Sequence, residues 1–297
     1  MLDRPTEARH PDSQDLHAIP GEDALSRLLG AQAAALEAVR PAIPAIEAAA
    51  QAGARALGSG GRMGYAGAGS SGTMALADAL EMAGPFGIPP RQTPMLLAGG
   101  AGALLHMTGA PEDDPALAQT DFDRVGFTRG DTLICVSASG GTPYTLAVAD
   151  MAQAAGITVV GLASVPGSRL LQLATIPILL DTGPEVVSGS TRMGAGTAAK
   201  VALNLLSTRV GLLLGHVHHG YMVNVTADNA KLVDRAARIV ADLSGQDLDA
   251  ARDALAATSG AVKPAILVAQ GATPEDAEDT LKRNQGHLSN ARWANDP

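Results

Sequence analysis

Two glycine- and serine-rich segments carry residue types that can hold a phosphate group. Glycine lets the backbone turn sharply and approach a ligand, and serine and threonine hydroxyls add hydrogen-bond donors. Each segment is followed by a helical pattern, and the backbone N–H groups at a helix N-terminus favour an anion. The candidate phosphate-binding residues are Gly69, Ser70, Ser71 and Gly72 in the first segment and Ser137, Ser139, Gly140 and Thr142 in the second.

Either segment alone has a purely structural explanation. A tight connection between a strand and a helix, with a serine as the N-cap, would use the same residue types. The first segment matches a dinucleotide-binding fingerprint only in its glycines, and no acidic residue follows where a ribose would require one. Two such segments, each after a strand, would lie together at the carboxyl edge of a parallel sheet, where α/β folds bind ligands. The pair therefore favours a ligand site.

The elements that would position these segments follow from the hydrophobic pattern. Five short apolar runs alternate with longer helical patterns, which is typical of a parallel sheet covered by helices on both faces. We therefore expect an α/β fold. The expected strands span residues 62–66, 95–98, 133–136, 158–162 and 176–180.

Helical patterns flank this central part of the chain. The Ala- and Leu-rich stretch 23–57 contains Pro41 and Pro44, which predict two helices joined near these prolines. Long helices are expected at 198–214 and 223–243, and short helices recur in the remainder. The expected divisions are an N-terminal arm with helices (1–57), a ligand-binding domain (58–243) and a C-terminal helical module (244–297).

The composition excludes several classes of protein. The 297 residues carry a net charge of −9 and only 2% aromatic residues. Both values argue against a nucleic-acid partner, because phosphate backbones need a basic surface and base stacking needs rings. A single cysteine excludes an intramolecular disulfide framework. The chain has no apolar run of the ~20 residues that a membrane span needs, and its polar N-terminus is not typical of a secretory signal. We expect a cytoplasmic protein that binds a small molecule.

The two segments resemble the phosphosugar-binding turns of the sugar isomerase (SIS) fold, and within it those of the N-acetylmuramic acid 6-phosphate etherases. The resemblance covers nearly the whole chain, and segment 183–193 is its longest part. It implies a three-layer sandwich with a mostly parallel five-stranded sheet, a ubiquitin-associated-like helical module at the C-terminus, and a homodimer. The other matching segments are 6–16, 78–81, 85–87, 97–100, 109–114, 195–197, 222–225 and 229–232, with Lys200.

The resemblance also implies a reaction. The family removes D-lactate from the C3 ether of N-acetylmuramic acid 6-phosphate by elimination across C2–C3 and addition of water, without a metal or redox cofactor. This chemistry needs a base for the C2 proton and an acid for the leaving oxygen, and two carboxyl groups in different environments can divide these roles. By resemblance, Glu81 and Glu112 are the catalytic pair. A phosphosugar isomerase and a non-catalytic phosphosugar-binding regulator are the alternatives.

Each glutamate also has a structural alternative. Glu81 follows Leu80 and precedes Met82, so we expect an apolar environment, although it could be a solvated glutamate at a helix end. Glu112 departs from the family pattern because Pro111 is inserted before it. Either the loop absorbs this residue or the carboxylate is displaced, and a displacement of about 1 Å can cost ~10²-fold in rate. A solvated acidic loop or a helix cap is the alternative for Glu112.

Segment 183–193 supplies further candidates for the sugar site. We interpret four of its residues as lining the sugar or the adjoining subunit's site, with packing or helix capping as the alternative. A histidine cluster at 216–219 could ligate a metal, but no nearby acidic residue or cysteine completes the set, so we expect no metal. The four residues of the sugar site are Glu185, Ser190, Thr191 and Arg192.

Three positively charged residues that are usual in the etherases are missing. Their positions hold Thr73, Gly141 and Gly194. Hydrogen bonds from Arg or Lys to carboxylates and phosphates are about twice as strong as neutral ones. We therefore expect weaker binding of an anionic substituent such as the carboxylate of lactate, and with it either a different group at C3 or a loss of catalysis.

Overall fold

The computed structural model describes residues 8–225, 230–289 and 291. By contacts within the chain, the residues form two compact units, Met1–Leu80 with Pro90–Arg209 and Glu81–Pro89 with Val210–Pro297. The division of the chain at residues 57 and 243 stays a prediction. In the described part of the chain, no helix is both long enough and apolar enough to cross a membrane.

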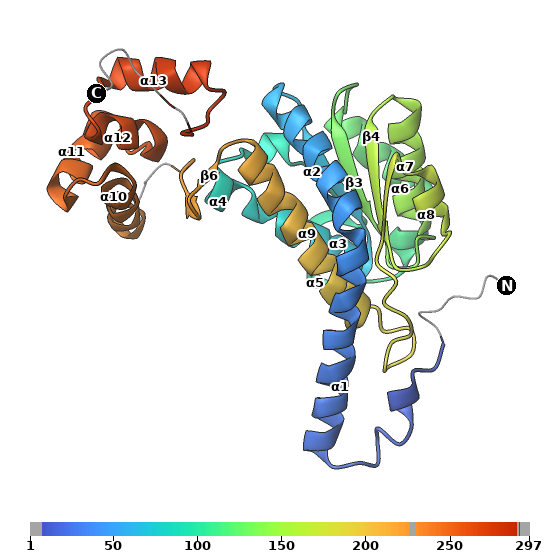
Figure 1. The fold of residues 1–297 in the computed structure, drawn as a ribbon. Coiled ribbons are helices and arrows are strands. Elements are labelled where there is room, and N and C mark those ends of the chain that lie inside the picture. Colours follow the sequence, from blue (N-terminus) through green and yellow to red (C-terminus); the bar gives the residue numbers. More distant parts are fainter. Residues whose placement is uncertain (1–7, 226–229, 290, 292–297) are drawn as a thin grey trace. The chain divides into compact units, whose positions relative to one another are not determined.

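The first unit is built on a five-stranded parallel sheet. Its strands are β1 (Met63–Gly67), β2 (Met95–Leu97), β3 (Thr132–Val136), β4 (Thr158–Ala163) and β5 (Ile176–Leu179). They lie in the order β2-β1-β3-β4-β5, and every pairing between them is parallel (Figure 1). Every residue of β1 and β3 is buried, as expected for strands covered on both faces. The five strands predicted from the hydrophobic pattern are confirmed.

Helices cover both faces of this sheet. The helices in this part of the chain are α1 (Gly21–Leu36), α2 (Ile43–Gly58), α3 (Gly69–Glu81), α5 (Gly100–Leu105), α6 (Pro115–Val125), α7 (Pro143–Ala154), α8 (Arg169–Leu173) and α9 (Gly194–Leu213). Figure 1 shows α6, α7 and α8 on one face and α2, α3 and α9 on the other. Short 3₁₀ turns complete the unit: η2 (Pro11–Ser13), η3 (Glu37–Ala42), η4 (Pro90–Gln92) and η5 (Ala110–Asp113).

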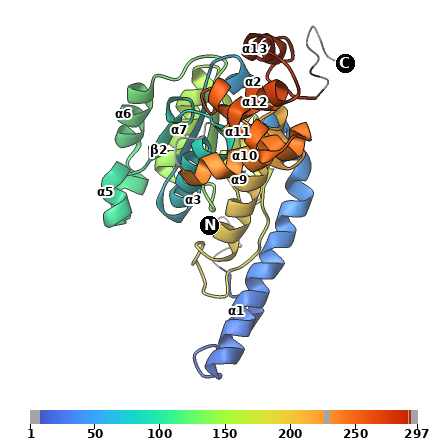
Figure 2. The same cartoon turned by 90° about the vertical axis from the view of Figure 1, so that its left-hand side faces the viewer.

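The N-terminal helices follow the proline signals. Pro41 lies in η3 between α1 and α2, and Pro44 lies in the first turn of α2, where a missing N–H costs nothing. The two helices predicted for 23–57 are therefore confirmed; Figure 2 shows α1 from the side. Residues 1–7 of the predicted polar arm lie outside the described residues.

The second unit combines a short hairpin with helices. The hairpin pairs β6 (Val217–His218) with β7 (Tyr221–Met222) in antiparallel fashion. Val223, Ile239, Leu255 and Ile266 are among the buried residues of its core. The helices are α4 (Ala83–Phe86), α10 (Ala230–Ser244), α11 (Leu248–Ala257), α12 (Val262–Ala269) and α13 (Pro274–Arg283).

The prediction of a helix from residue 223 is wrong at its start. The N–H of Val223 donates to His216 O, and the Asn224 side chain donates to Phe86 O, so this segment continues the hairpin. Residues 226–229 lie outside the described residues, and the helix that follows is α10. The apolar residues 223 and 225 fit either an extended or a helical pattern, so periodicity alone could not separate the two.

A close backbone approach joins the end of β1 to the start of α3. A Cβ on Gly67 would lie 2.9 Å from Gly72 Cα and 3.1 Å from Val136 O, and a Cβ on Gly72 would lie 2.8 Å from the carbonyl of Gly67. Backbone atoms cannot rotate away as a side chain can. Only glycine therefore fits at positions 67 and 72 without moving the turn.

We expect Gly72→Ala to destabilise the protein by about 1–3 kcal/mol, the usual cost of overpacking. The matched control is Gly30→Ala in α1, where a Cβ would meet nothing within 4 Å and should stabilise the helix by about 1 kcal/mol. Thermal and urea unfolding of both variants measure the difference. An unfolding midpoint for Gly72→Ala at or above that of the unmodified protein would contradict this packing argument.

Candidate active site

The first glycine-serine turn directly follows β1 and forms the first turn of α3. Gly69 has φ +53°, a conformation that favours glycine. Ser70 and Ser71 are half-buried beside it, and the Thr73 hydroxyl donates to Gly69 O over 3.0 Å. Thr73, where the resemblance leads us to expect a cation, thus closes the turn internally with its hydroxyl.

The second turn is organised by a buried hydroxyl. Ser137 Oγ accepts from the N–H of Gly140 over 3.1 Å and lies 2.8 Å from Thr142 Oγ1 and 3.3 Å from Ser139 Oγ. The N–H of Gly141 donates to Ser139 Oγ over 3.2 Å. Pro143 then begins α7, as its fixed φ predicts.

A hydrogen bond joins the two turns. Because β1 and β3 are neighbours, Gly67 and Val136 pair at their carboxyl ends, and the N–H of Ala138 donates to Ser71 Oγ over 3.2 Å. The structure therefore brings the two predicted segments together at one sheet edge. Chemically, this edge offers hydroxyls, backbone N–H groups and a helix N-terminus, which suit an anion without any cationic side chain.

Glu112 lies against the first turn. A Cβ on Gly69 would be 2.6 Å from Glu112 Oε1. The inserted Pro111 is taken up by η5, where it packs against Gly99 and the N–H of Glu112 donates to Gly109 O. Whether the loop absorbs this residue without displacing the carboxylate stays a prediction. Burial, and to a lesser degree the charge of Asp113, raise the pKa of the Glu112 carboxyl.

The apolar surroundings expected for Glu81 are wrong for the single chain. Glu81 is the last residue of α3 and its side chain is exposed. Met82 is buried, but Leu80 is 69% exposed. Successive residues on a helix point about 100° apart, so apolar neighbours in the sequence do not enclose a side chain. Its catalytic role stays a prediction.

Glu185 acts as a helix cap. Its buried carboxylate accepts from the N–H groups of Gly194 and Ala195, both over 2.9 Å, at the start of α9. This is the capping alternative, and it satisfies two N–H groups that have no partner within the helix. A Cβ on Gly194 would be 3.1 Å from both Glu185 Oε2 and Ala35 Cβ, so a lysine there would crowd the cap.

The other residues of this segment form the turn that leads into α9. Ser190 and Thr191 are half-buried, and Arg192 is exposed. The N–H of Thr191 donates to Gly189 O and its own carbonyl accepts from Gly196, so backbone bonds hold the turn. Whether these side chains line a sugar stays a prediction.

One residue of the second turn's surroundings was missed from the sequence. Ser168 contacts Gly140, because a Cβ on that glycine would clash with the Ser168 hydroxyl. The Ser168 Oγ is buried and has no hydrogen-bond partner among the described residues. Ser168 lies shortly after β4, the neighbour of β3 in the sheet. Its place after the carboxyl end of a predicted strand is the sequence signal that indicates it.

The histidines and the cysteine do not form a metal site. Within the ranges that the structure describes, no group of three potential ligands could hold a metal ion. Burial lowers the pKa of His216 to about 4 and raises the pKa of Cys135 to about 12. Both groups are thus held neutral at ordinary pH.

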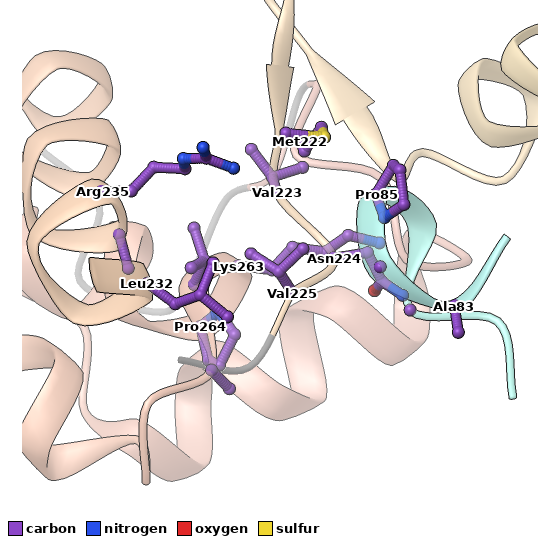
Figure 3. A pocket seen from close by; sticks show the side chains of 15 residues that line it. Ala83, Pro85, Met222, Val223, Asn224, Val225, Leu232, Arg235, Lys263 and Pro264 are labelled. Carbon is purple, nitrogen blue, oxygen red and sulfur yellow. The ribbon is translucent and has the colours of Figure 1, made fainter. Parts of the chain in front are cut away.

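A cavity of about 630 Å³ lies in the second unit (Figure 3). Its lining comes from α4, the segment 222–225, α10 and the start of α12. Figure 3 shows Arg235 reaching over a largely apolar wall that includes Val223 and Pro264. Among the described residues that line this cavity, none is a predicted site residue.

Comparison with known proteins gives a family and several relatives of this chain. Residues 30–164 match the family model for the SIS domain. An N-acetylmuramic acid 6-phosphate etherase of Deinococcus radiodurans is 43% identical over 285 residues, which cover 96% of this chain and 93% of that protein. One of Pectobacterium atrosepticum is 41% identical over 86% of this chain and 84% of its own length. A solved phosphoheptose isomerase from Francisella tularensis shares the fold, with a TM-score of 0.50 and 20% identity over 65% of this chain and 100% of its own.

We expect Glu112→Gln to stabilise the protein at neutral pH but not in acid. A carboxyl whose pKa is higher in the folded state contributes stability below its unfolded pKa and loses it as the pH rises through the folded value. The variant cannot ionise, so its unfolding midpoint should exceed that of the unmodified protein at about pH 7 and not at about pH 3.5. Thermal unfolding across this range measures the difference. Glu278→Gln, at an exposed position of α13, is the control, and equal behaviour of both variants would refute the argument.

Proposed function

The chain belongs to the N-acetylmuramic acid 6-phosphate etherase family, and on this premise we propose that it cleaves the D-lactyl ether of N-acetylmuramic acid 6-phosphate or a closely related amino-sugar phosphate. The products are D-lactate and N-acetylglucosamine 6-phosphate, which makes the protein a carbon–oxygen lyase. The observation that carries the proposal is the 43% identity along 96% of the chain, which spans both compact units.

In this proposal the phosphate binds at the two turns. The hydroxyls of Ser70, Ser71 and Thr142 supply donors, and the N-terminus of α3 adds a partial positive charge. The bond between Ala138 and Ser71 supports the assignment, because it ties the two turns into one surface. The phosphate then holds the reacting carbons in a fixed position.

Glu81 and Glu112 are the proposed acid and base. The base takes the C2 proton of the open-chain sugar, the electron pair forms the C2–C3 double bond, and the C3–O bond breaks. The acid gives its proton to the departing lactate oxygen, and water then adds at C3 while a proton returns to C2. The raised pKa of Glu112 supports its part, since a carboxyl that titrates nearer neutral pH exchanges protons more effectively.

The missing cations should weaken the binding of the lactyl carboxylate more than the binding of the phosphate. Thr73 and Glu185 are engaged in local hydrogen bonds, and a side chain at Gly194 would crowd the cap. We therefore propose that the phosphate is held by neutral donors, whereas the lactate carboxylate binds more weakly than it would beside Arg or Lys.

We further propose a homodimer, a cytoplasmic location and a role in peptidoglycan recycling. The homodimer is supported by apolar side chains on one face of α1, where Leu25 and Leu29 are 67% and 69% exposed. A second copy would cover this face, since leucines at positions i and i+4 lie side by side on a helix.

Incubation with N-acetylmuramic acid 6-phosphate should release D-lactate, and Glu81→Gln should lower this release by at least ~10²-fold while leaving the affinity for N-acetylglucosamine 6-phosphate nearly unchanged. The physical reason is that the amide cannot transfer a proton but keeps the size of the side chain. An enzymatic lactate assay and calorimetry measure the two quantities.

Glu278→Gln on α13 is the control and should keep full activity. A phosphosugar isomerase or a regulator would bind the sugar phosphate and release no lactate, which would refute the etherase proposal. Full activity of Glu81→Gln would refute the assignment of Glu81 alone.

A further inference from the structure

A buried carboxylate ties three elements of the first unit together. Asp78 is only 4% exposed, and its Oδ2 accepts from the Tyr65 hydroxyl over 2.9 Å. Its Oδ1 accepts from Asn204 Nδ2 over 2.9 Å and from the Ser207 hydroxyl over 2.8 Å. Tyr65 belongs to β1, Asp78 to α3, and Asn204 and Ser207 to α9. One carboxylate thus fixes α3 against a strand and against a second helix.

In all three of these hydrogen bonds the Asp78 carboxylate is the acceptor. Asn204 Nδ2 can only donate, and the Tyr65 hydroxyl stays protonated because burial, and then the Asp78 charge, raise the pKa of Tyr65 well above its usual value. A carboxylate is therefore the matched acceptor for its neighbours. A buried acceptor cluster of this kind specifies one arrangement of the elements that carry it.

Asp78 lies near the end of α3, close in the sequence to the proposed catalytic residue Glu81. The helix begins with the first turn and ends at Glu81, three residues after Asp78. Residues three apart on a helix lie on neighbouring turns of one side. The first turn has its own anchors in the Gly67–Gly72 contact and the Ala138–Ser71 bond, whereas the Glu81 side chain is exposed. At the last turn of α3, Asp78 is the buried group that makes hydrogen bonds, beside the apolar packing of Ala79 and Met82.

We propose that Asp78 is a positioning residue that fixes the direction of Glu81 through its bonds to Tyr65, Asn204 and Ser207. The inference rests on the proposed function for its catalytic consequence. In this proposal the two ends of α3 have different roles. The start binds phosphate through its own contacts, and the end carries a reacting group that the buried carboxylate holds in place.

The test is a set of exchanges between Asp78 and Asn204. Asp78→Asn replaces one of the two acceptor oxygens by an NH2 group, so the three donors Tyr65, Asn204 and Ser207 no longer all find an acceptor. Asn204→Asp sets two carboxylates against each other, so each single variant should lower kcat by about tenfold to a hundredfold. The KM for the phosphosugar should change by less than about twofold, because the first turn keeps its contacts. The double variant restores a donor opposite an acceptor and should recover most of kcat.

Asp131→Asn is the matched control for a loss of stability alone. Asp131 is 2% exposed and accepts from the Arg62 guanidinium over 2.8 Å, but it precedes β3, at the opposite end of the strand from the turns. This variant should lower the unfolding midpoint and keep the kcat of the unmodified protein, measured well below that midpoint. Unchanged kcat in Asp78→Asn, or no recovery in the double variant, would overturn the inference.

Amide hydrogen exchange gives a readout that needs no turnover. Asp78→Asn should speed exchange in the last turn of α3 and leave the first turn's amides as protected as before, and equal exchange at both ends would overturn the inference. If the unmodified protein released no lactate while this difference in exchange was found, the proposed function would fail and the positioning by Asp78 would stand.

Discussion

The pairing of Gly67 with Val136 is the constraint on which the candidate site depends. These are the last residues of two neighbouring parallel strands, so the chain leaves both strands at the same level. Each exit must turn within a few residues into a helix, and the glycines at 67 and 72 allow the first of these turns to close. A shift of register would separate Ala138 from Ser71 and divide the site into two unrelated turns.

In the proposed function, hydroxyls and the dipole of a helix N-terminus hold the phosphate in place of cationic side chains. Ser137 organises the second turn from a buried position, and Thr73 closes the first. At the start of α9, the carboxylate of Glu185 occupies the space beside Gly194. A net charge of −9 is compatible with the proposed phosphosugar, because local dipoles at the two turns can attract a phosphate whatever the net charge of the chain.

The strands and the pair of turns could be predicted from the sequence, because short apolar runs and glycine-serine segments are local signals. The surroundings of single side chains could not. Leu80 suggested an apolar environment for Glu81, yet helix geometry leaves both exposed. Glu185 accepts from N–H groups nine and ten residues further along the chain, and Asp78 accepts from Ser207, which is 129 residues away. Neither contact has a signature in the local sequence pattern. At residues 223–225 a local signal was itself ambiguous. The apolar residues there fit an extended segment or a helix, and the predicted helix was wrong.

The central claim is that this chain carries out an elimination followed by addition of water on a phosphosugar. The most direct measurement is the mass of the N-acetylglucosamine 6-phosphate formed from N-acetylmuramic acid 6-phosphate in deuterium oxide. We predict that D-lactate is released and that the sugar product carries one carbon-bound deuterium, at C2. Release of lactate with no deuterium at C2 would contradict an elimination, because the ether would then break without removal of the C2 proton.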